Sequence, residues 1–452
     1  MAVNRLNILI FFSTSKQVKK YGQLFVPNAV VKQFLHTYTF EVESARPNSL
    51  HTSTNFFRVT RKLHALIHSA AIWQNRYSSF YFTYMAFGAL GSVKQSEKYN
   101  SFLQYHNRRR GFFARRAIKL ASSKIHLLIL KSLLNLLFLI EYLKLKDSIC
   151  NEIDLVIFPY GGRISLEFDF YVWHYNRKNI DTLGLQENWD NLSSKGILLI
   201  HPKYFATWGK QSSSHLKTIQ GFNGDVFEVG DPGIQKFYEF FQSEIHPNQK
   251  LDRFDKYSEL NPYILVIGSG DGIYDSEIIK TCKNFIQKTF MDDLRVIDLI
   301  YRPHPYSRIS ESSKFEIESI PGIIFDDVSM PADDVHRLSL IHKSLCVVAL
   351  YSTVLLEASI LEKVCVIPSF VGAEFNYKTS SYLDDSDHYA GMSSLDTILN
   401  VKTVKEFYSV LSRDPKSFFT SREPNATYTF CLDVDFIDAL NDIFERISMS
   451  DR

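Results

Sequence analysis

Short apolar runs bounded by Gly, Pro or Asp recur along the chain, and they constrain its fold more than any other feature of the sequence. Runs of about four to eight residues that are rich in Val and Ile are typical of strands buried on both faces of a sheet. Helical stretches separate several of the runs, and this alternation predicts the α/β class, with parallel sheets and right-handed crossovers. The runs are IDLVIFP from Ile153, KGILLI from Lys195, YILVIG from Tyr263, RVIDLIY from Arg295, LCVVALY from Leu345 and VCVIPSF from Val364, and the helical stretches include DSEIIKTCKNFIQKTF from Asp275 and STVLLEASILEK from Ser352.

The domain organisation follows from the length and from one polar stretch. A chain of 452 residues exceeds the size of one domain, which is about 100 to 200 residues. The stretch 237–262 is polar, contains two prolines and separates two strand-rich blocks. We therefore expect an N-terminal Rossmann-like domain at 1–245 and a C-terminal one at 258–452. Ligands of such domains bind in the cleft outside the carboxyl ends of the strands.

Charge and cysteine content exclude several classes of protein. The 51 Lys and Arg residues nearly balance the 49 Asp and Glu residues, giving a net charge of +2, so we expect no nucleic-acid partner. The five cysteines form no CxxC and no zinc-finger spacing, so we expect neither a disulfide scaffold nor a structural zinc. The N-terminal apolar run lacks a signal cleavage site and predicts a first strand. Reduced thiols and the missing signal indicate a cytoplasmic protein.

The segment 107–146 combines a basic stretch with a long apolar one. The apolar stretch is about as long as a membrane span, but Lys131, Asn135 and Glu141 interrupt it, so we do not predict a transmembrane helix. Two interpretations remain open: a core helix with a solvated basic lead-in, or a segment lying on an anionic membrane surface. The basic residues are Arg108, Arg109, Arg110, Arg115, Arg116, Lys119 and Lys124.

The sequence DLIYRPHPYSR places an imidazole where a strand ends. His304 lies between two prolines that restrict the backbone. Arg302 and Arg308 add positive charge that favours an anion, so the stretch predicts phosphate recognition. The alternative is a strand-end histidine that fills a polar niche.

The sequence LYSTVLLEAS predicts a strand followed by a tight turn and a helix. Ser352 is expected as the N-cap and Thr353 as the first helical residue, so that the helix start could bind a phosphate. Glu357 shares the helix face of Thr353 and could accept hydrogen bonds from ribose hydroxyls. The alternative is ordinary N-capping with a Glu on the helix surface.

Together these motifs resemble the C-terminal domain of GT-B glycosyltransferases of bacterial surface-polysaccharide assembly. The order of YRPHP and YSTVLLEAS is similar to that in CDP-glycerol glycerophosphotransferases and in capsule sialyl- and Kdo-transferases, which share an HP motif and a Ser-Ser or Ser-Thr motif. LGLQENWDNLSSKG, YFATWGKQSSSH and VFEVGDPGIQKFY resemble the end of the N-terminal domain of such proteins. The resemblance covers about 154–370 and implies the GT-B fold, with two parallel sheets that face each other across a cleft.

The resemblance also implies an activity. It is the transfer of a sugar from a nucleotide-activated donor, CMP-linked or another nucleotide sugar, to a surface-polysaccharide or lipid-linked glycan, without a metal or cofactor. In that case His304, Ser352 and Thr353 would hold the donor phosphate and stabilise the leaving group, and Glu357 would hold the ribose. Asp190 or Glu187 would be the base that activates the acceptor hydroxyl.

The chain departs from these families in two places. The sialyl- and Kdo-transferases carry an acidic pair before a Gly in their N-terminal domain, whereas the nearest match here, Gly270, Asp271 and Gly272, follows the first strand of the second domain. We expect this turn to approach the donor. The glycerophosphotransferases carry His-Gly where this chain has Trp189 and Asp190, which leaves the base and the donor open.

Two DxD sequences, at 385–387 and 433–435, match the metal-binding motif of GT-A transferases. The first lies in a polar loop and the second is expected to cap the last helix, so we expect no metal site. Two other functions remain open: a sugar-nucleotide epimerase or hydrolase of the same fold, and a non-catalytic nucleotide-binding module. A lipid-linked acceptor would place the protein at the cytoplasmic face of the inner membrane as a peripheral protein.

Overall fold

The structure is a computed structural model, and every structural statement concerns the part of the chain that it describes. Those residues are 7–12, 30–35, 54–75, 120–143, 153–161, 166–189, 191–195, 197–235, 238–239, 261–268, 274–290, 296–304, 311–326, 334–350, 352–371, 395–413, 431 and 434–450.

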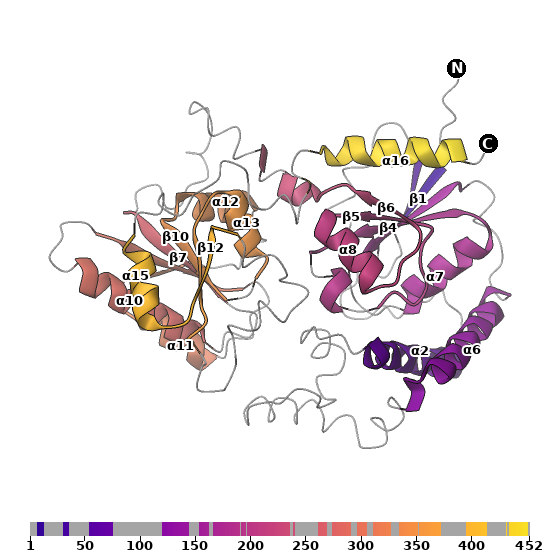
Figure 1. The fold of residues 1–452 in the computed structure, drawn as a ribbon, viewed down its shortest axis with the longest axis horizontal. Helices are drawn as coiled ribbons and strands as arrows, with labels where there is room; N and C mark the ends of the chain where they lie inside the picture. Colours follow the sequence, from indigo (N-terminus) through magenta and orange to yellow (C-terminus); the bar gives the residue numbers. More distant parts are fainter. Residues whose placement is uncertain are drawn as a thin grey trace.

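Two parallel six-stranded sheets form the framework, one in each lobe of the molecule (Figure 1). The first has the order β2-β1-β3-β4-β5-β6 and the second the order β12-β11-β10-β7-β8-β9. The strands of the first sheet are β1 (Asn7–Phe12), β2 (Val30–Leu35), β3 (Leu155–Tyr160), β4 (Asp181–Gln186), β5 (Tyr204–Thr207) and β6 (Asp225–Glu228). Those of the second are β7 (Tyr263–Ile267), β8 (Asp298–Arg302), β9 (Ile323–Phe325), β10 (Cys346–Ala349), β11 (Cys365–Pro368) and β12 (Ile398–Val401).

Helices connect and cover the strands, as parallel pairing requires. In the first lobe these are α2 (Thr54–Asn75), α6 (Lys124–Tyr142), α7 (Leu166–Arg177) and α8 (Lys210–Thr218). Those that follow are α10 (Asp275–Phe290), α11 (Glu311–Glu318), α12 (Asp334–Lys343), α13 (Val354–Ile360), α15 (Val404–Leu411) and α16 (Phe436–Ser450). The predicted class is confirmed: the fold is α/β, with two parallel sheets in Rossmann-like units.

The strand β7 shows why the apolar runs form the centre of a sheet. Its successive side chains point to opposite faces. Ile264 and Val266 pack in one apolar cluster with the buried side of α10, and Leu265 and Ile267 pack in another with residues of α12 and α13. Both faces are thus buried, which explains the continuous apolar sequence of this strand.

One of the predicted strands is wrong. In the run KGILLI, Ile197, Leu198 and Leu199 are buried and Ile200 is partly buried, but 197–200 form no strand; they follow a short π-helix, Asn191–Lys195, as irregular chain. The backbone N–H of Leu198 donates to the side-chain Oε1 of Gln220 at 2.8 Å instead of to a neighbouring strand. The strand in this part of the chain is β5, a few residues later. Apolar content alone predicts burial here, but it does not predict backbone conformation.

The last helix, α16, packs on the first sheet although it follows the second sheet in the chain (Figure 1). Phe436, Leu440 and Ile443 lie in one apolar cluster with Leu155 and Ile157 of β3. Helix α16 lies within the predicted C-terminal domain, 258–452, and yet packs on the sheet of the N-terminal one. The predicted domain bounds stay predictions.

Asp435 caps α16, as expected from its DxD sequence. Its Oδ1 accepts from the backbone N–H groups of Ile437 and Asp438 at 2.8 and 2.9 Å. The expected capping role is thus confirmed for Asp435, whereas Asp433 and the other DxD sequence, 385–387, lie outside the described residues.

Candidate functional site

The strand order of the second sheet defines where a ligand can approach. From β7 the chain adds β8 and β9 on one side and then returns to add β10, β11 and β12 on the other. The order reverses between β7 and β10, and in open α/β sheets ligands bind at such a reversal, outside the carboxyl ends of the strands. The two predicted motifs follow β8 and β10, the two neighbours of β7.

His304 and Ser352 lie at the same edge of this sheet. His304 follows the last residue of β8, and Ser352 follows β10. One strand separates β8 from β10, so the two strand ends lie about 10 Å apart, which is twice the strand spacing. His304 and Ser352 are both half-buried, whereas Thr353 is exposed. The two motifs that the sequence predicted as one site thus follow the strands on either side of β7, and the site itself stays a prediction.

The start of α13 differs in detail from the prediction. The Ser352 hydroxyl accepts from the backbone N–H of Val354 at 3.3 Å, and its carbonyl accepts from Leu355 N–H at 3.1 Å. Thr353 already has helical dihedral angles and makes no capping hydrogen bond through its side chain. Ser352 therefore has the predicted capping role. However, α13 spans only Val354–Ile360, so we expect a smaller contribution from the helix dipole than the sequence implied.

Arg302 forms a buried ion pair. Its guanidinium donates to the carboxylate of Asp326, whose other oxygen lies 2.9 Å from His336 Nε2. Burial alone would raise the pKa of Asp326, but the hydrogen bond with His336 and the charge of Arg302 outweigh burial and hold its pKa below the ordinary value. Arg302 is thus engaged with a carboxylate, and it holds the end of β8 beside Asp326. Its predicted contact with donor phosphate stays a prediction.

Helix α12 reaches both motifs with two consecutive side chains. His336 contacts Asp326, and through it Arg302, while the Nε of Arg337 lies 3.1 Å from the Oε2 of Glu357 on α13. Glu357 is buried, with 7% of its surface exposed, and its predicted ribose contact stays a prediction. The sequence analysis did not identify His336 and Arg337, because α12 follows a strand that has no recognised motif.

The end of β7 leaves no room for a side chain. A Cβ at Gly268 would lie 2.7 Å from both Asp275 Oδ2 and the Tyr301 hydroxyl oxygen, and 3.1 Å from Pro303 Cα. The Tyr301 hydroxyl donates to Asp275 Oδ2 at 2.7 Å. Glycine at this position lets β7, β8 and the start of α10 meet closely beneath the predicted site.

In the first domain, the predicted base region lies against residues of the second domain. Glu187 directly follows β4 and is buried, with 5% of its surface exposed. Trp189 is buried in an apolar cluster that also contains Tyr263 and Leu265 of β7. Its indole N–H donates to Gln211 Oε1 at 2.8 Å. This side of the first domain therefore contacts the domain that carries the two motifs.

Several predicted residues lie outside the described part of the chain: Asp190, Arg308, Gly270, Asp271 and Gly272.

Two surface pockets in the described part have volumes of about 350 and 620 Å³, and neither is lined by a predicted site residue. A group that could bind a metal, His64, His68 and Asp169, has all its ligand atoms within 4.8 Å of one another and belongs to the first domain. The fold and the strand-end motifs together define a two-domain, Rossmann-like α/β protein.

No protein family model and no curated protein matches the sequence. Similar solved structures include the UDP-GlcNAc 2-epimerase of Methanocaldococcus jannaschii in complex with UDP-GlcNAc and UDP, with 13% identity, a TM-score of 0.42 and coverage of 70% of this chain and 82% of that chain. The Neisseria meningitidis UDP-GlcNAc 2-epimerase bound to UDP-GlcNAc has 9% identity, a TM-score of 0.43 and coverages of 71% and 82%. The N-terminal domain of Candida albicans trehalose-6-phosphate phosphatase has 10% identity, a TM-score of 0.39 and coverages of 73% and 76%. At these values the likeness assigns no activity to this chain.

Proposed function

We propose that the chain is a nucleotide-sugar enzyme, and specifically a GT-B glycosyltransferase similar to those of bacterial surface-polysaccharide assembly. The observation that supports this proposal is the position of His304 and Ser352 on either side of β7, where the strand order reverses. The donor would be a CMP-linked or other nucleotide sugar, and the acceptor a polysaccharide or lipid-linked glycan. The reaction would need no metal or cofactor.

The proposed chemistry assigns a role to each side of the strand-end site. The His304 imidazole would stabilise the negative charge that develops on the leaving phosphate as the sugar departs. The hydroxyls of Ser352 and Thr353 would donate to phosphate oxygens, since one is half-buried and the other exposed. Arg302 would act through Asp326, by fixing the end of the strand that carries His304.

Transfer also requires a base that accepts the proton of the acceptor hydroxyl. Asp190 and Glu187 are the candidates, and Glu187 is buried at the end of β4. We expect Asp190→Asn to bind donor and to lose transfer, with Glu187→Gln as the paired variant. If Asp190→Asn stays active and Glu187→Gln does not, the base is Glu187.

A sugar-nucleotide epimerase or hydrolase is the second candidate, because the same phosphate site would serve it. Incubation of the pure protein with UDP-GlcNAc and with CMP-linked sugars, without acceptor, distinguishes the two activities. An epimer or rapid release of free nucleotide would contradict the transferase proposal. Product that forms only when glycan acceptor is added would support it.

A thermal-shift screen with CMP, CDP, UDP and their sugars tests the binding site directly, since a ligand of the folded state raises the melting temperature. We expect at least one nucleotide to stabilise the wild-type protein and to lose this effect in Ser352→Ala. The absence of stabilisation by any nucleotide, with calorimetric titration in agreement, would favour the third candidate, a non-catalytic module.

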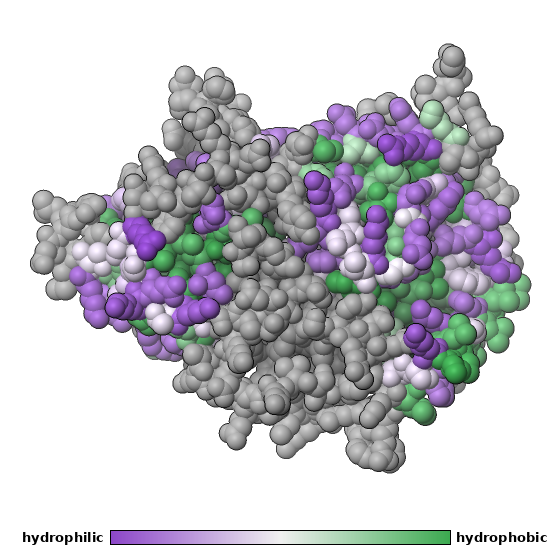
Figure 2. Space-filling view, viewed as in Figure 1, coloured by the Kyte–Doolittle hydropathy of each residue, from purple (hydrophilic) through white to green (hydrophobic). Residues whose placement is uncertain are grey.

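We further propose that α6 rests on an anionic membrane surface, on the cytoplasmic side. By length and composition this helix could cross a membrane. One side of it packs on α2 and α7 through Leu127, Leu134 and Phe138. The opposite side exposes an apolar stripe, which lies over α6 at the lower right of Figure 2, and the basic residues of 107–124 precede it. The stripe consists of Ile125, Leu128, Ile129, Leu133 and Leu136.

Sedimentation with vesicles containing anionic lipid tests the membrane proposal. The double variant Leu128→Glu with Leu136→Glu should bind about tenfold or more weakly, because both side chains are exposed and would enter the lipid boundary. Val296→Glu, at an exposed apolar position of the second domain, is the matched control and should bind as the wild type does. Equal binding by the double variant would contradict the proposal.

A further inference from the structure

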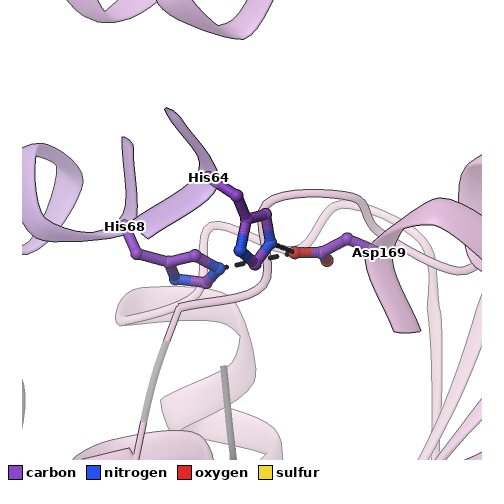
Figure 3. A group of neighbouring side chains, drawn as sticks. All are labelled: His64, His68 and Asp169. Atoms are coloured by element: carbon purple, nitrogen blue, oxygen red, sulfur yellow. Dashed lines mark hydrogen bonds and ion pairs between the residues drawn. The ribbon is translucent and has the colours of Figure 1, made fainter. Parts of the chain in front are cut away.

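Three buried side chains of the first domain converge on one point, away from the strand-end site (Figure 3). His64 and His68 lie on α2, and Asp169 lies on α7. Their exposed fractions are 2%, 2% and 3%. Their ligand atoms all lie within 4.8 Å of one another.

The geometry follows from the helix repeat. Residues four apart share a helix face, so both imidazoles of α2 point toward α7. His64 Nε2 lies 2.6 Å from Asp169 Oδ2, and His68 Nε2 lies 3.4 Å from the same oxygen. Ligand atoms of a tetrahedral zinc ion lie about 3.3 Å apart, because Zn–N and Zn–O bonds are about 2.0 Å long. The His68 distance matches this separation, and the His64 distance would have to widen.

The charges of the group favour a cation. Burial alone would raise the pKa of Asp169, but hydrogen bonds with both imidazoles outweigh burial and keep the carboxyl ionised. Burial lowers the pKa of His68. The His68 Nδ1 is also buried without a hydrogen-bond partner. A buried carboxylate oxygen between two buried imidazole nitrogens is an arrangement that a cation would stabilise.

Other titratable groups close to Asp169 are Lys131, His201 and Tyr160. Burial lowers the pKa of Lys131 and also that of His201, while it raises that of Tyr160. Among these groups Lys131 is the alternative counter-ion, and burial disfavours its charged form.

We propose that His64, His68 and Asp169 form a binding site for a divalent transition-metal ion, with zinc as the best-matched class. Two imidazole nitrogens and one carboxylate oxygen are ligands that zinc accepts, and a fourth position would remain for water. The ion would connect α2 to α7, and so fix the helix pair α2 and α6 to the first sheet. The site shares no residue with the proposed sugar transfer, which would use His304, Ser352 and Thr353 of the second domain and Asp190 or Glu187 of the first.

Titration of the full chain with metal tests the proposal. After removal of metal with a chelator, the protein should bind one Co²⁺ per chain with the visible absorption of a tetrahedral site. Zn²⁺ should displace Co²⁺ and raise the melting temperature. If neither ion binds and the melting temperature is the same with and without Zn²⁺, the group is a hydrogen-bonded cluster without a metal and the proposal is wrong.

Variants assign the binding to this group. His68→Gln and Asp169→Asn should each lower Co²⁺ affinity about tenfold or more. His126→Gln, at an exposed histidine of α6, is the matched control and should keep the wild-type affinity. Circular dichroism in chelator separates loss of a ligand from loss of folding. A folded His68→Gln protein with unchanged Co²⁺ affinity would overturn the assignment. If both variants unfold, the titration of the wild-type protein alone decides whether the chain binds a metal ion.

Discussion

Each domain contains a buried carboxylate in contact with histidine, and the two differ in how its charge is balanced. Asp326 of the second domain pairs with the permanent charge of Arg302 and with His336. Asp169 of the first domain contacts two imidazoles through Oδ2 and accepts from the backbone N–H of Ile200 at 3.4 Å through Oδ1, with Lys131 as a nearby cation of lowered pKa.

The carboxylate of Asp326 already has a cationic partner, whereas the carboxylate of Asp169 is placed to bind a further cation. The Asp326 pair needs no further charge and holds the edge of the sheet on which His304 lies. The Asp169 group lacks an equivalent positive charge, which is why we propose a metal ion there and not in the second domain. Four predictions test this contrast.

Asp326→Asn should have the largest effect, because it leaves the Arg302 guanidinium buried without a counter-charge. We expect a loss of about 3 to 5 kcal/mol in the free energy of unfolding, measured with urea, in the presence or absence of Zn²⁺. Glu316→Gln is the control, since Glu316 pairs with Lys280 at a half-exposed site and should cost less than about 1 kcal/mol. A loss as small as that of the control would show that the buried pair does not stabilise the domain.

His304→Ala should lower turnover by about 10²-fold, or about 2.7 kcal/mol, if the imidazole stabilises the leaving group. The free energy of unfolding should change little, in contrast to Asp326→Asn, because His304 is half-buried and lies beyond the ion pair. Steady-state kinetics and urea unfolding of the same preparation check both statements. Wild-type turnover in a folded variant would remove His304 from the proposed chemistry.

The pH dependence of stability should reflect the depressed pKa of Asp326. Since this pKa lies below the unfolded value of about 3.8, the stabilisation is complete above that pH and is lost as the pH falls through the folded pKa. We expect the wild type to lose stability below about pH 4 more steeply than Asp326→Asn does. Urea unfolding from pH 6 to pH 3 measures the two slopes, and equal slopes would contradict the assignment.

Ser352→Ala should have the smallest effect on stability, about 1 kcal/mol, which is typical of a lost helix cap. Thr403→Ala is a close control, because Thr403 caps α15 by accepting from Glu406 N–H at 3.1 Å and also follows a strand of the second sheet. Both variants should lose similar stability, whereas only Ser352→Ala should weaken nucleotide binding in the thermal-shift screen. Equal nucleotide binding by both variants would contradict the position of the proposed site.

The sequence predicted the central strands of the second sheet because they are buried on both faces and therefore continuously apolar. It did not predict β4, in which Asp181, Thr182 and Gln186 are buried. The buried polar side chains of this strand have hydrogen-bond partners: the Thr182 hydroxyl donates to Asn176 Oδ1 at 2.6 Å, and Gln186 Oε1 accepts from the backbone N–H of Trp208 at 3.0 Å. Hydropathy does not reveal a buried strand whose polar groups find partners elsewhere in the chain.

The strand-end site was predictable in part for a similar reason. His304 and Ser352 follow recognisable strands, and parallel strands bring their carboxyl ends to one edge. His336 and Arg337 lie on a helix without such a marker. Asp169 lies 105 residues from His64 and 101 from His68, so no local spacing connects them. The spacing of His64 and His68 was the one available signal for that group.

The return of α16 to the first sheet means that the polypeptide links the two lobes twice. A single cut between the sheets would leave the N-terminal fragment without Phe436, Leu440 and Ile443, and its apolar face would be open to water. Gln235 strengthens the second link, because its Oε1 accepts from Phe436 N–H at 3.0 Å. The first lobe is thus not a self-sufficient folding unit without α16, and its recovery from fragments should require α16 to be supplied in trans.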